Sequence, residues 1–183
     1  MWGALLLALL IVPLGCGGGD STNSSAESGK EQLYPWVKGP SREFIVPYGD
    51  NIVQTFGDEA TPAERKQVSQ IMHAWFRARA AKQWTKDCSY FSRRYAKELT
   101  LDANNVTNGR VKTCPQALSY FGYKASGDVK NVNLEGQIDS LRVSRNKGYA
   151  QYHGTDGKDW IIPVERENGE WKIGIAAPIN RFR

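Results

Sequence analysis

His153 and Asp159 are the two residues whose types and spacing best suit proton-transfer chemistry in this 183-residue chain. Each stands at the end of a predicted strand, and five turn-forming residues (154–158) separate them. Pairing of the two strands in a hairpin would bring the imidazole close to the carboxylate, as general acid–base catalysis requires. The alternative is that the pair lies at the solvent-exposed mouth of the hairpin and has no catalytic role.

Other kinds of reactive site find little support in the sequence. The two histidines, His73 and His153, stand at unrelated spacing, and the chain contains no CxxC or HxxxH pattern, so no dedicated zinc site is predicted. The glycine-rich stretch GCGGG lies outside any strand–turn–helix context, and the chain lacks a serine nucleophile elbow. We therefore expect no metal and no cofactor.

Capping signals and apolar periodicity predict helices in the middle of the chain. Thr61-Pro62-Ala63-Glu64 combines an N-cap, a first-position proline and an N3 glutamate, which is a capping box. Apolar residues then recur at helical spacing from Val68 to Trp75. Three further stretches carry helical signals: residues 84–91, residues 92–99 behind a Ser92 cap, and a helix opened by a second capping box at 113–116.

After Gly127 the apolar period changes from about 3.6 residues to two, which indicates strands. They are predicted near residues 132–134, 141–143, 149–153, 160–164 and 171–175. Asn168-Gly169 is a strong hairpin signal, whereas Pro163 cannot donate to a ladder and so marks a sheet edge or a bulge. Helices followed by an antiparallel meander predict an α+β fold.

The N-terminal residues predict an export signal and a linker. Residues 2–14 are almost wholly apolar and uncharged, yet as a helix they would rise only about 20 Å, too little for a hydrocarbon core of roughly 30 Å. We interpret residues 1–15 as a signal peptide, although no Lys or Arg precedes the run; the alternative is a buried helix. Residues 16–42, rich in Gly, Ser and Asn, predict a flexible tether to a domain at 43–183.

The three cysteines point to a lipid anchor and a disulfide. Gly15-Cys16 resembles the processing site of bacterial lipoproteins, although Pro13 and Leu14 depart from its usual pattern; the alternative is ordinary cleavage near Gly15 and a secreted soluble protein. A lipid on Cys16 would leave Cys88 and Cys114 as a pair in a compartment that permits disulfides. The alternative for this pair is two buried free thiols.

The net charge of +5 and the isoelectric point near 9.1 suit an anionic partner. For an exported protein this partner would be phospholipid headgroups or acidic envelope polymers, and we expect no nucleic acid. The alternative is a solvated surface, because the basic residues of the predicted helices are interspersed with acidic ones.

Residues 43–178 resemble the nuclear transport factor 2-like superfamily, and within it small exported lipoproteins of actinobacteria. The likeness is carried by HAWFRARAAKQW (73–84), DCSYFS (87–92), CPQAL (114–118) and ENGEWKIGIAAP (167–178). The resemblance implies a cystatin-like α+β cone, with helices packed on a curved antiparallel sheet. Within such a cone, His153 and Asp159 would be the catalytic candidates and four aromatic residues would line the pocket: Tyr120, Tyr123, Tyr152 and Trp160.

Two functions follow from this interpretation. The first is a membrane-tethered extracytoplasmic domain that binds an anionic envelope polymer or a small apolar ligand without catalysis. The second is a small-molecule enzyme of the cyclase, isomerase or dehydratase type that uses the cavity of the cone. Nothing in the sequence predicts the oligomeric state.

Overall fold

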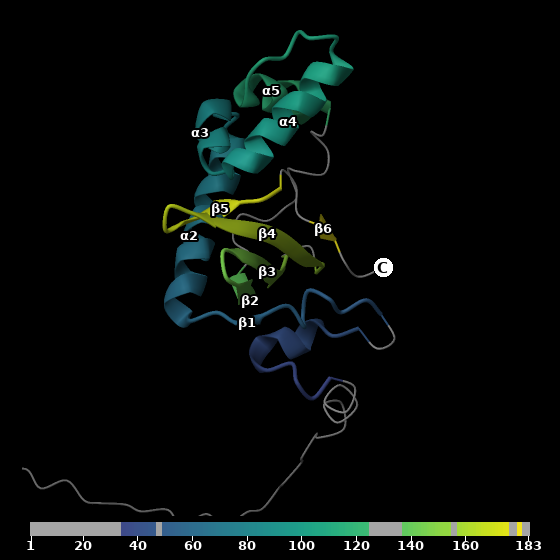
Figure 1. Cartoon of the computed structure of the whole chain (residues 1–183), viewed down its shortest axis with the longest axis vertical. Coiled ribbons are helices and arrows are strands. Elements are labelled where there is room, and N and C mark those ends of the chain that lie inside the picture. Colours follow the sequence, from purple (N-terminus) through teal and green to yellow (C-terminus); the bar gives the residue numbers. More distant parts are fainter. Residues whose placement is uncertain (1–33, 47–48, 125–136, 155–156, 176–178, 181–183) are drawn as a thin grey trace, which may run out of the picture.

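The computed structural model describes residues 34–46, 49–124, 137–154, 157–175 and 179–180 (Figure 1). In chain order its elements are the 3₁₀ helix η1 (Gly39–Phe44), strand β1 (Asp58–Glu59), helices α2 (Pro62–Ala80), α3 (Trp84–Ser89), α4 (Arg93–Val106) and α5 (Cys114–Lys124), and strands β2 (Gln137–Ser144), β3 (Lys147–His153), β4 (Asp159–Glu167), β5 (Glu170–Ile173) and β6 (Ile179–Asn180). Helices therefore precede most of an antiparallel sheet, and the predicted α+β class is confirmed.

The predicted helix starts are confirmed by their caps. The Thr61 hydroxyl accepts a hydrogen bond from the Glu64 N–H, and the Glu64 carboxylate accepts one from the Thr61 N–H, so the capping box of α2 is complete. Ser92 accepts from the Tyr95 N–H at the start of α4. At α5 the Gln116 side chain accepts from the Thr113 N–H, which is half of the predicted box.

The strands form one sheet in the order β1-β2-β3-β4-β5, in which every pairing is antiparallel and β6 also pairs with β4. The predicted Asn168-Gly169 turn joins β4 to β5, and both residues have positive φ (51° and 84°), as a two-residue hairpin loop requires. The predicted strand at 132–134 lies outside the described residues. The hairpin turn and the other predicted strands are confirmed.

Pro163 lies in β4, which is not an edge strand, but it stands where the neighbouring ladder is broken. β5 pairs with β4 from Val164 onward, and β6 pairs with it at Trp160 and Ile161. The Pro163 carbonyl accepts from the Gly174 N–H on this side. The N and C=O of one residue point to the same side of a strand, so the N of Pro163 also faces the side of β5 and β6. The N–H that proline lacks is therefore missing from a place where the ladder is already interrupted. The prediction of a sheet edge is therefore wrong, and Pro163 instead stands where the ladder between β4 and its neighbours β5 and β6 is interrupted.

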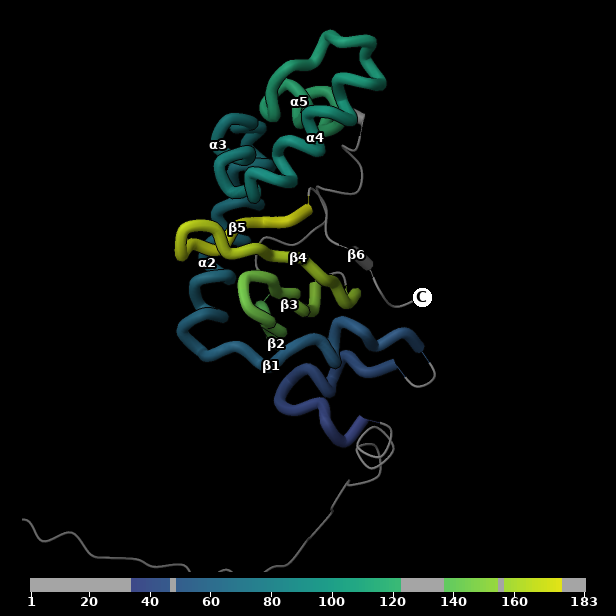
Figure 2. The backbone as a smooth tube through the Cα atoms, in the orientation of Figure 1, coloured from purple at the N-terminus to yellow at the C-terminus, as the bar shows by residue number. Residues whose placement is uncertain are grey.

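The sheet is covered on both faces. Helix α2 packs on one face, where Val68, Trp75, Leu141, Ala150 and Tyr152 belong to the main apolar core. Residues 34–46 and 49–57, here called the N-terminal cover, lie on the other side of the sheet from α3, α4 and α5 (Figure 2). The cover has buried apolar residues of its own, and none of them belongs to the main core: Val37, Phe44 and Ile45.

The cover begins before the predicted domain boundary at residue 43. Val37 and Ser41, which the sequence predicted to be part of the tether, are fully buried. The Ser41 and Ser140 hydroxyls lie 2.6 Å apart and each lies 2.7 Å from the Glu59 carboxylate, which joins η1 to β2 and β1. Composition alone could not reveal this packing, because a single valine and a single serine make no periodic pattern.

Replacing Gln151 with methionine is expected to stabilise the fold. The Gln151 side chain is fully buried in β3, and neither of its amide atoms has a hydrogen-bond partner among the described residues. An unsatisfied buried polar group costs about 1–3 kcal/mol, and methionine has a similar volume without that cost. We expect the free energy of unfolding, measured by denaturant titration, to rise by about 1 kcal/mol or more. The control is Gln137→Met at an exposed position of β2, which should change little; a destabilised Gln151→Met variant would contradict the prediction.

Candidate functional site

His153 and Asp159 lie side by side, as hairpin pairing predicted. They are the last residue of β3 and the first residue of β4, and they are partners in the strand register. His153 Nδ1 and Asp159 Oδ1 form a short hydrogen bond. Their side chains are 47 % and 25 % exposed, so the pair lies at the open end of the hairpin. This is the location that the non-catalytic alternative required.

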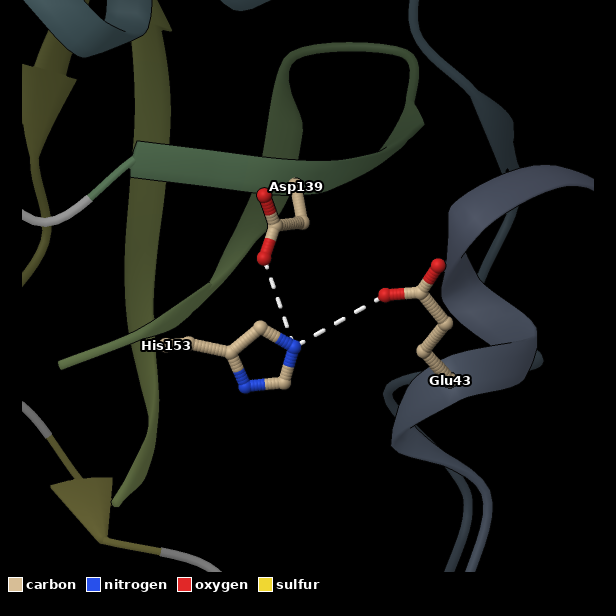
Figure 3. A group of neighbouring side chains, drawn as sticks. All are labelled: Glu43, Asp139 and His153. Carbon is tan, nitrogen blue, oxygen red and sulfur yellow. Dashed lines mark ion pairs between the residues drawn. The ribbon is translucent and has the colours of Figure 1, made fainter. Parts of the chain in front are cut away.

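Two further carboxylates face the other nitrogen of the same imidazole, and the sequence analysis missed both. Asp139 Oδ2 lies 3.3 Å from His153 Nε2, and Glu43 Oε2 lies 3.7 Å from it. Figure 3 shows the two carboxylates approaching the imidazole from different elements, Asp139 from β2 and Glu43 from η1. We call His153, Glu43, Asp139 and Asp159 the histidine–carboxylate cluster.

A β-bulge in β2 explains the position of Asp139. Ile138 pairs with Tyr152 and Ser140 pairs with Gln151, so Asp139 is an extra residue that the ladder skips. Bulges commonly re-aim a side chain in this way. The Asp139 carbonyl accepts a hydrogen bond from Arg65 Nη1 of α2 at 2.9 Å. Arg65 of α2 therefore stabilises the backbone of the bulge, while the Asp139 carboxylate points to His153.

The N-terminal cover positions both Glu43 and the imidazole ring. Phe44, which is 1 % exposed, stacks on His153 with ring centroids 4.8 Å apart and an interplanar angle of 11°. The buried Phe44 anchors the end of η1, so that the preceding Glu43 lies at the surface beside the ring. The imidazole is thus restrained by Phe44 on one face and by Asp159 at Nδ1.

The electrostatics of the cluster favour positive charge. Burial raises the pKa of Asp139 above its usual range; His153 opposes this rise, and the nearby Glu43 carboxylate adds to it. Three carboxylates surround one imidazole, so a cation placed among them would relieve their mutual repulsion. The cluster could hold a bound cation or a cationic group of a ligand.

Three of the four predicted pocket residues lie in the main core or pack against it. Tyr152 is fully buried in the main core, and Tyr120 and Trp160 pack partly buried against that core. Because neighbours in a strand point to opposite faces, Tyr152 and Trp160 face the helices, whereas His153 and Asp159 face the N-terminal cover. The side chain of Tyr123 lies outside the described residues. The structure therefore places Tyr152 and Trp160 on the opposite face of the sheet from the predicted catalytic pair.

The predicted disulfide is confirmed: Cys88 of α3 and Cys114 of α5 are bonded, with their Cα atoms 6.1 Å apart. Cys16, the predicted lipidation site, lies outside the described residues, as do residues 1–33 of the predicted signal peptide and tether. Within the described ranges, no helix has both the length and the apolar character that crossing a bilayer would require.

Comparisons of the chain with protein-family models, curated proteins and solved structures found no match. The relationship to the nuclear transport factor 2-like superfamily therefore stays a prediction.

Proposed function

We propose that this protein is an exported lipoprotein, held at the outer face of the cell membrane by a lipid on Cys16, and that its α+β domain binds a partner without catalysing a reaction. The domain would stand off the membrane on the tether that precedes Tyr34. The observation that carries the proposal is the pairing of Cys88 with Cys114, because it accounts for two of the three cysteines.

The disulfide supports export and singles out Cys16. Structural disulfides persist in oxidising compartments and are rare in the cytosol. In an exported chain, an odd cysteine needs an explanation of its own. Cys16 follows a glycine directly after the apolar run of residues 2–14, which is where a lipoprotein carries its lipid.

The packing of the domain supports binding in preference to catalysis. Large aromatic side chains belong to the core between α2 and the sheet, and three of them are at most 2 % exposed: Trp75, Tyr152 and Trp171. A cavity enzyme would need that space for its substrate together with a buried acid or base. Here the His153–Asp159 pair lies on the opposite face and is open to solvent.

We further propose that the fold is the cystatin-like cone of the nuclear transport factor 2-like superfamily. Its support is the order of elements, with helices α2 to α5 followed by the meander β2 to β5. The resemblance of residues 43–178 adds the disulfide-bearing motifs DCSYFS and CPQAL. This superfamily includes enzymes as well as binding domains, so the fold alone does not select the function.

The partner could be an anionic envelope polymer or a small apolar ligand, besides the membrane itself. The net charge of +5 favours the polymer. Two arginines of α4 do not contribute freely to such a surface, because Arg93 pairs with Glu167, and Arg94 pairs with Glu98 and Glu165.

Mass spectrometry of the mature N-terminus tests the lipid anchor. The full chain is expressed with its own leader in a bacterium that processes lipoproteins, and the purified protein is also partitioned between detergent and aqueous phases. We expect a mature chain that begins at Cys16, carries the mass of a lipid and enters the detergent phase, because acyl chains bind strongly to apolar phases.

The matched control is Cys16→Ser, which should lose both the lipid mass and the detergent partitioning. The double variant Cys88→Ala/Cys114→Ala should keep both, because neither residue takes part in anchoring. An unmodified wild-type N-terminus at any residue other than Cys16 would refute the lipoprotein proposal.

A further inference from the structure

We propose that His153 Nε2, Asp139 and Glu43 form a binding site for a divalent transition-metal ion, with zinc as the ion that fits best. The proposal goes beyond the membrane-anchored binding function and does not depend on it. The site joins three elements that are far apart in the sequence: η1, β2 and β3. One ligand atom of each residue lies within 4.8 Å of the other two.

The distances match those between ligands that share a metal ion. Zinc bonds to nitrogen and carboxylate oxygen are about 2.0–2.2 Å long, so two ligand atoms in a tetrahedral site lie about 3.3–3.6 Å apart. The separation of His153 Nε2 from Asp139 Oδ2 is 3.3 Å, and its separation from Glu43 Oε2 is 3.7 Å. The Glu43 side chain is 62 % exposed and can close the small remaining difference by rotation.

The other side of the imidazole has the partner that a metal-binding histidine normally has. His153 Nδ1 is hydrogen-bonded to Asp159. When the Nδ1–H group donates a hydrogen bond to that carboxylate, Nε2 presents its lone pair to Asp139 and Glu43, where the metal would bind. Phe44 stacks on the ring and fixes its plane. The ring is thus oriented before any ion arrives.

The ligand set selects the class of metal. An imidazole nitrogen favours zinc and neighbouring transition metals, whereas magnesium and calcium prefer sites made of oxygen alone. Two carboxylates supply the negative charge that a divalent ion needs. Three protein ligands leave a fourth position for water or for a group of a partner, as in zinc sites that are not purely structural.

Metal binding would fasten the N-terminal cover to the sheet. Glu43 belongs to η1, whereas Asp139 and His153 belong to β2 and β3. An ion bound by all three therefore links the segment nearest to the tether with the centre of the domain. A ligand that binds only the folded form stabilises it by mass action, and here the gain should be concentrated in the cover.

The test is a titration of the full chain, purified in detergent, with zinc chloride. All samples carry Cys16→Ser so that the thiol of this residue cannot bind zinc. Isothermal titration calorimetry should show one zinc ion per chain. Hydrogen exchange of residues 39–45 should slow when zinc is added, because Glu43 becomes a ligand.

Three substitutions separate the roles of the residues. His153→Gln and Glu43→Gln remove ligands and should lower zinc affinity by at least tenfold, and Asp159→Asn should lower it about 10- to 100-fold through the orientation of the ring. Glu43 is mostly exposed, so Glu43→Gln should leave the melting temperature without zinc unchanged. The matched control is His73→Gln on α2, which removes the other histidine and should leave zinc affinity unchanged.

Several outcomes would overturn the proposal. A Cys16→Ser chain without further substitutions that binds no zinc would show that the cluster is only a set of ion pairs around His153. Equal losses in His153→Gln and His73→Gln would place the zinc elsewhere. Calcium or magnesium binding as tight as zinc binding, with the same dependence on Glu43, would refute the transition-metal assignment.

Discussion

Replacing Asp87 with asparagine is expected to lower the free energy of unfolding by about 3–5 kcal/mol, which is typical for the loss of one partner from a buried ion pair. The Asp87 carboxylate is completely buried in α3. It accepts two hydrogen bonds from Arg79, from Nε at 2.8 Å and from Nη2 at 3.1 Å. Asparagine has nearly the same shape, so the loss should come from charge and hydrogen bonding rather than from a cavity.

The cost is large because Arg79 cannot leave its surroundings easily. Its side chain is only 10 % exposed, and its guanidinium carbon lies 4.8 Å from the centre of the Trp75 ring and 5.7 Å from that of Phe91. These cation–π contacts favour the charge but do not replace the carboxylate. An asparagine at residue 87 would remove the negative charge beside a mostly buried arginine and offer it one side-chain oxygen in place of two.

Replacing the other partner of the ion pair, Arg79→Met, should lower the free energy of unfolding by an amount that depends on pH. Burial raises the pKa of Asp87, and the hydrogen bonds from Arg79 oppose this rise, so removing Arg79 should raise the pKa further. A carboxyl group whose pKa is higher in the folded than in the unfolded chain stabilises the fold when protonated, and this stability is lost as the pH rises. The difference in free energy of unfolding between the wild type and Arg79→Met should therefore shrink as the pH falls from about 7 to about 5.

Denaturant titrations at several pH values check both expectations. The control is Glu98→Ala, which breaks the exposed Arg94–Glu98 pair and should change stability by less than about 0.5 kcal/mol. The double variant Arg79→Met/Asp87→Leu should lose less than either single variant, because no charge is left unpaired. A deficit of Arg79→Met that stays constant with pH would show that Asp87 is not the group responsible.

Local signals in the sequence predicted the elements well. The capping box at Thr61 and Glu64, the Ser92 cap and the Asn168-Gly169 turn each specify a backbone conformation within a few residues, and the structure has all of them. Their chemistry is short-range, because a side chain bonds to a backbone group three residues away. A single sequence is sufficient to recognise such features.

The candidate site could be predicted only in part, for a physical reason. His153 and Asp159 are joined by a hairpin, so their pairing follows from the register of adjacent strands. Asp139 faces His153 because of a bulge that breaks the alternation of β2, and Glu43 arrives from a segment predicted to begin the domain. Neither position has a pattern of its own in the sequence, since both depend on long-range packing.

The same strand geometry explains why two predicted pocket residues, Tyr152 and Trp160, lie on the opposite face from His153 and Asp159. Tyr152 precedes His153 and Trp160 follows Asp159, so each aromatic residue is next to a polar partner in sequence. Adjacent residues of a strand point to opposite faces. Because Tyr152 and Trp160 are each adjacent in sequence to a residue of the cluster, their side chains point to the opposite face, toward the main core.

Removing the disulfide with Cys88→Ala/Cys114→Ala is expected to lower the free energy of unfolding by about 3.5 kcal/mol. The bond joins residues that are 26 positions apart, and in the chain-entropy model the open loop gives the unfolded chain this much additional freedom. For a chain of this size the melting temperature should fall by roughly 10 °C. Thermal melts of the oxidised wild type and of the double variant measure the difference.

The position of the disulfide predicts which part of the domain should lose stability first when the bond is removed. The closed loop contains α4, and its ends lie in α3 and at the start of α5, so the bond holds these three helices together at one end of the domain (Figure 1). Hydrogen exchange in α3 and α5 should accelerate more than in β3 and β4, which the bond does not touch. A reductant should lower the melting temperature of the wild type to that of the double variant and leave the variant unchanged. Equal melting temperatures of the oxidised wild type and the variant would contradict the loop-entropy argument, because they would require the unfolded chain to be as restricted without the bond as with it.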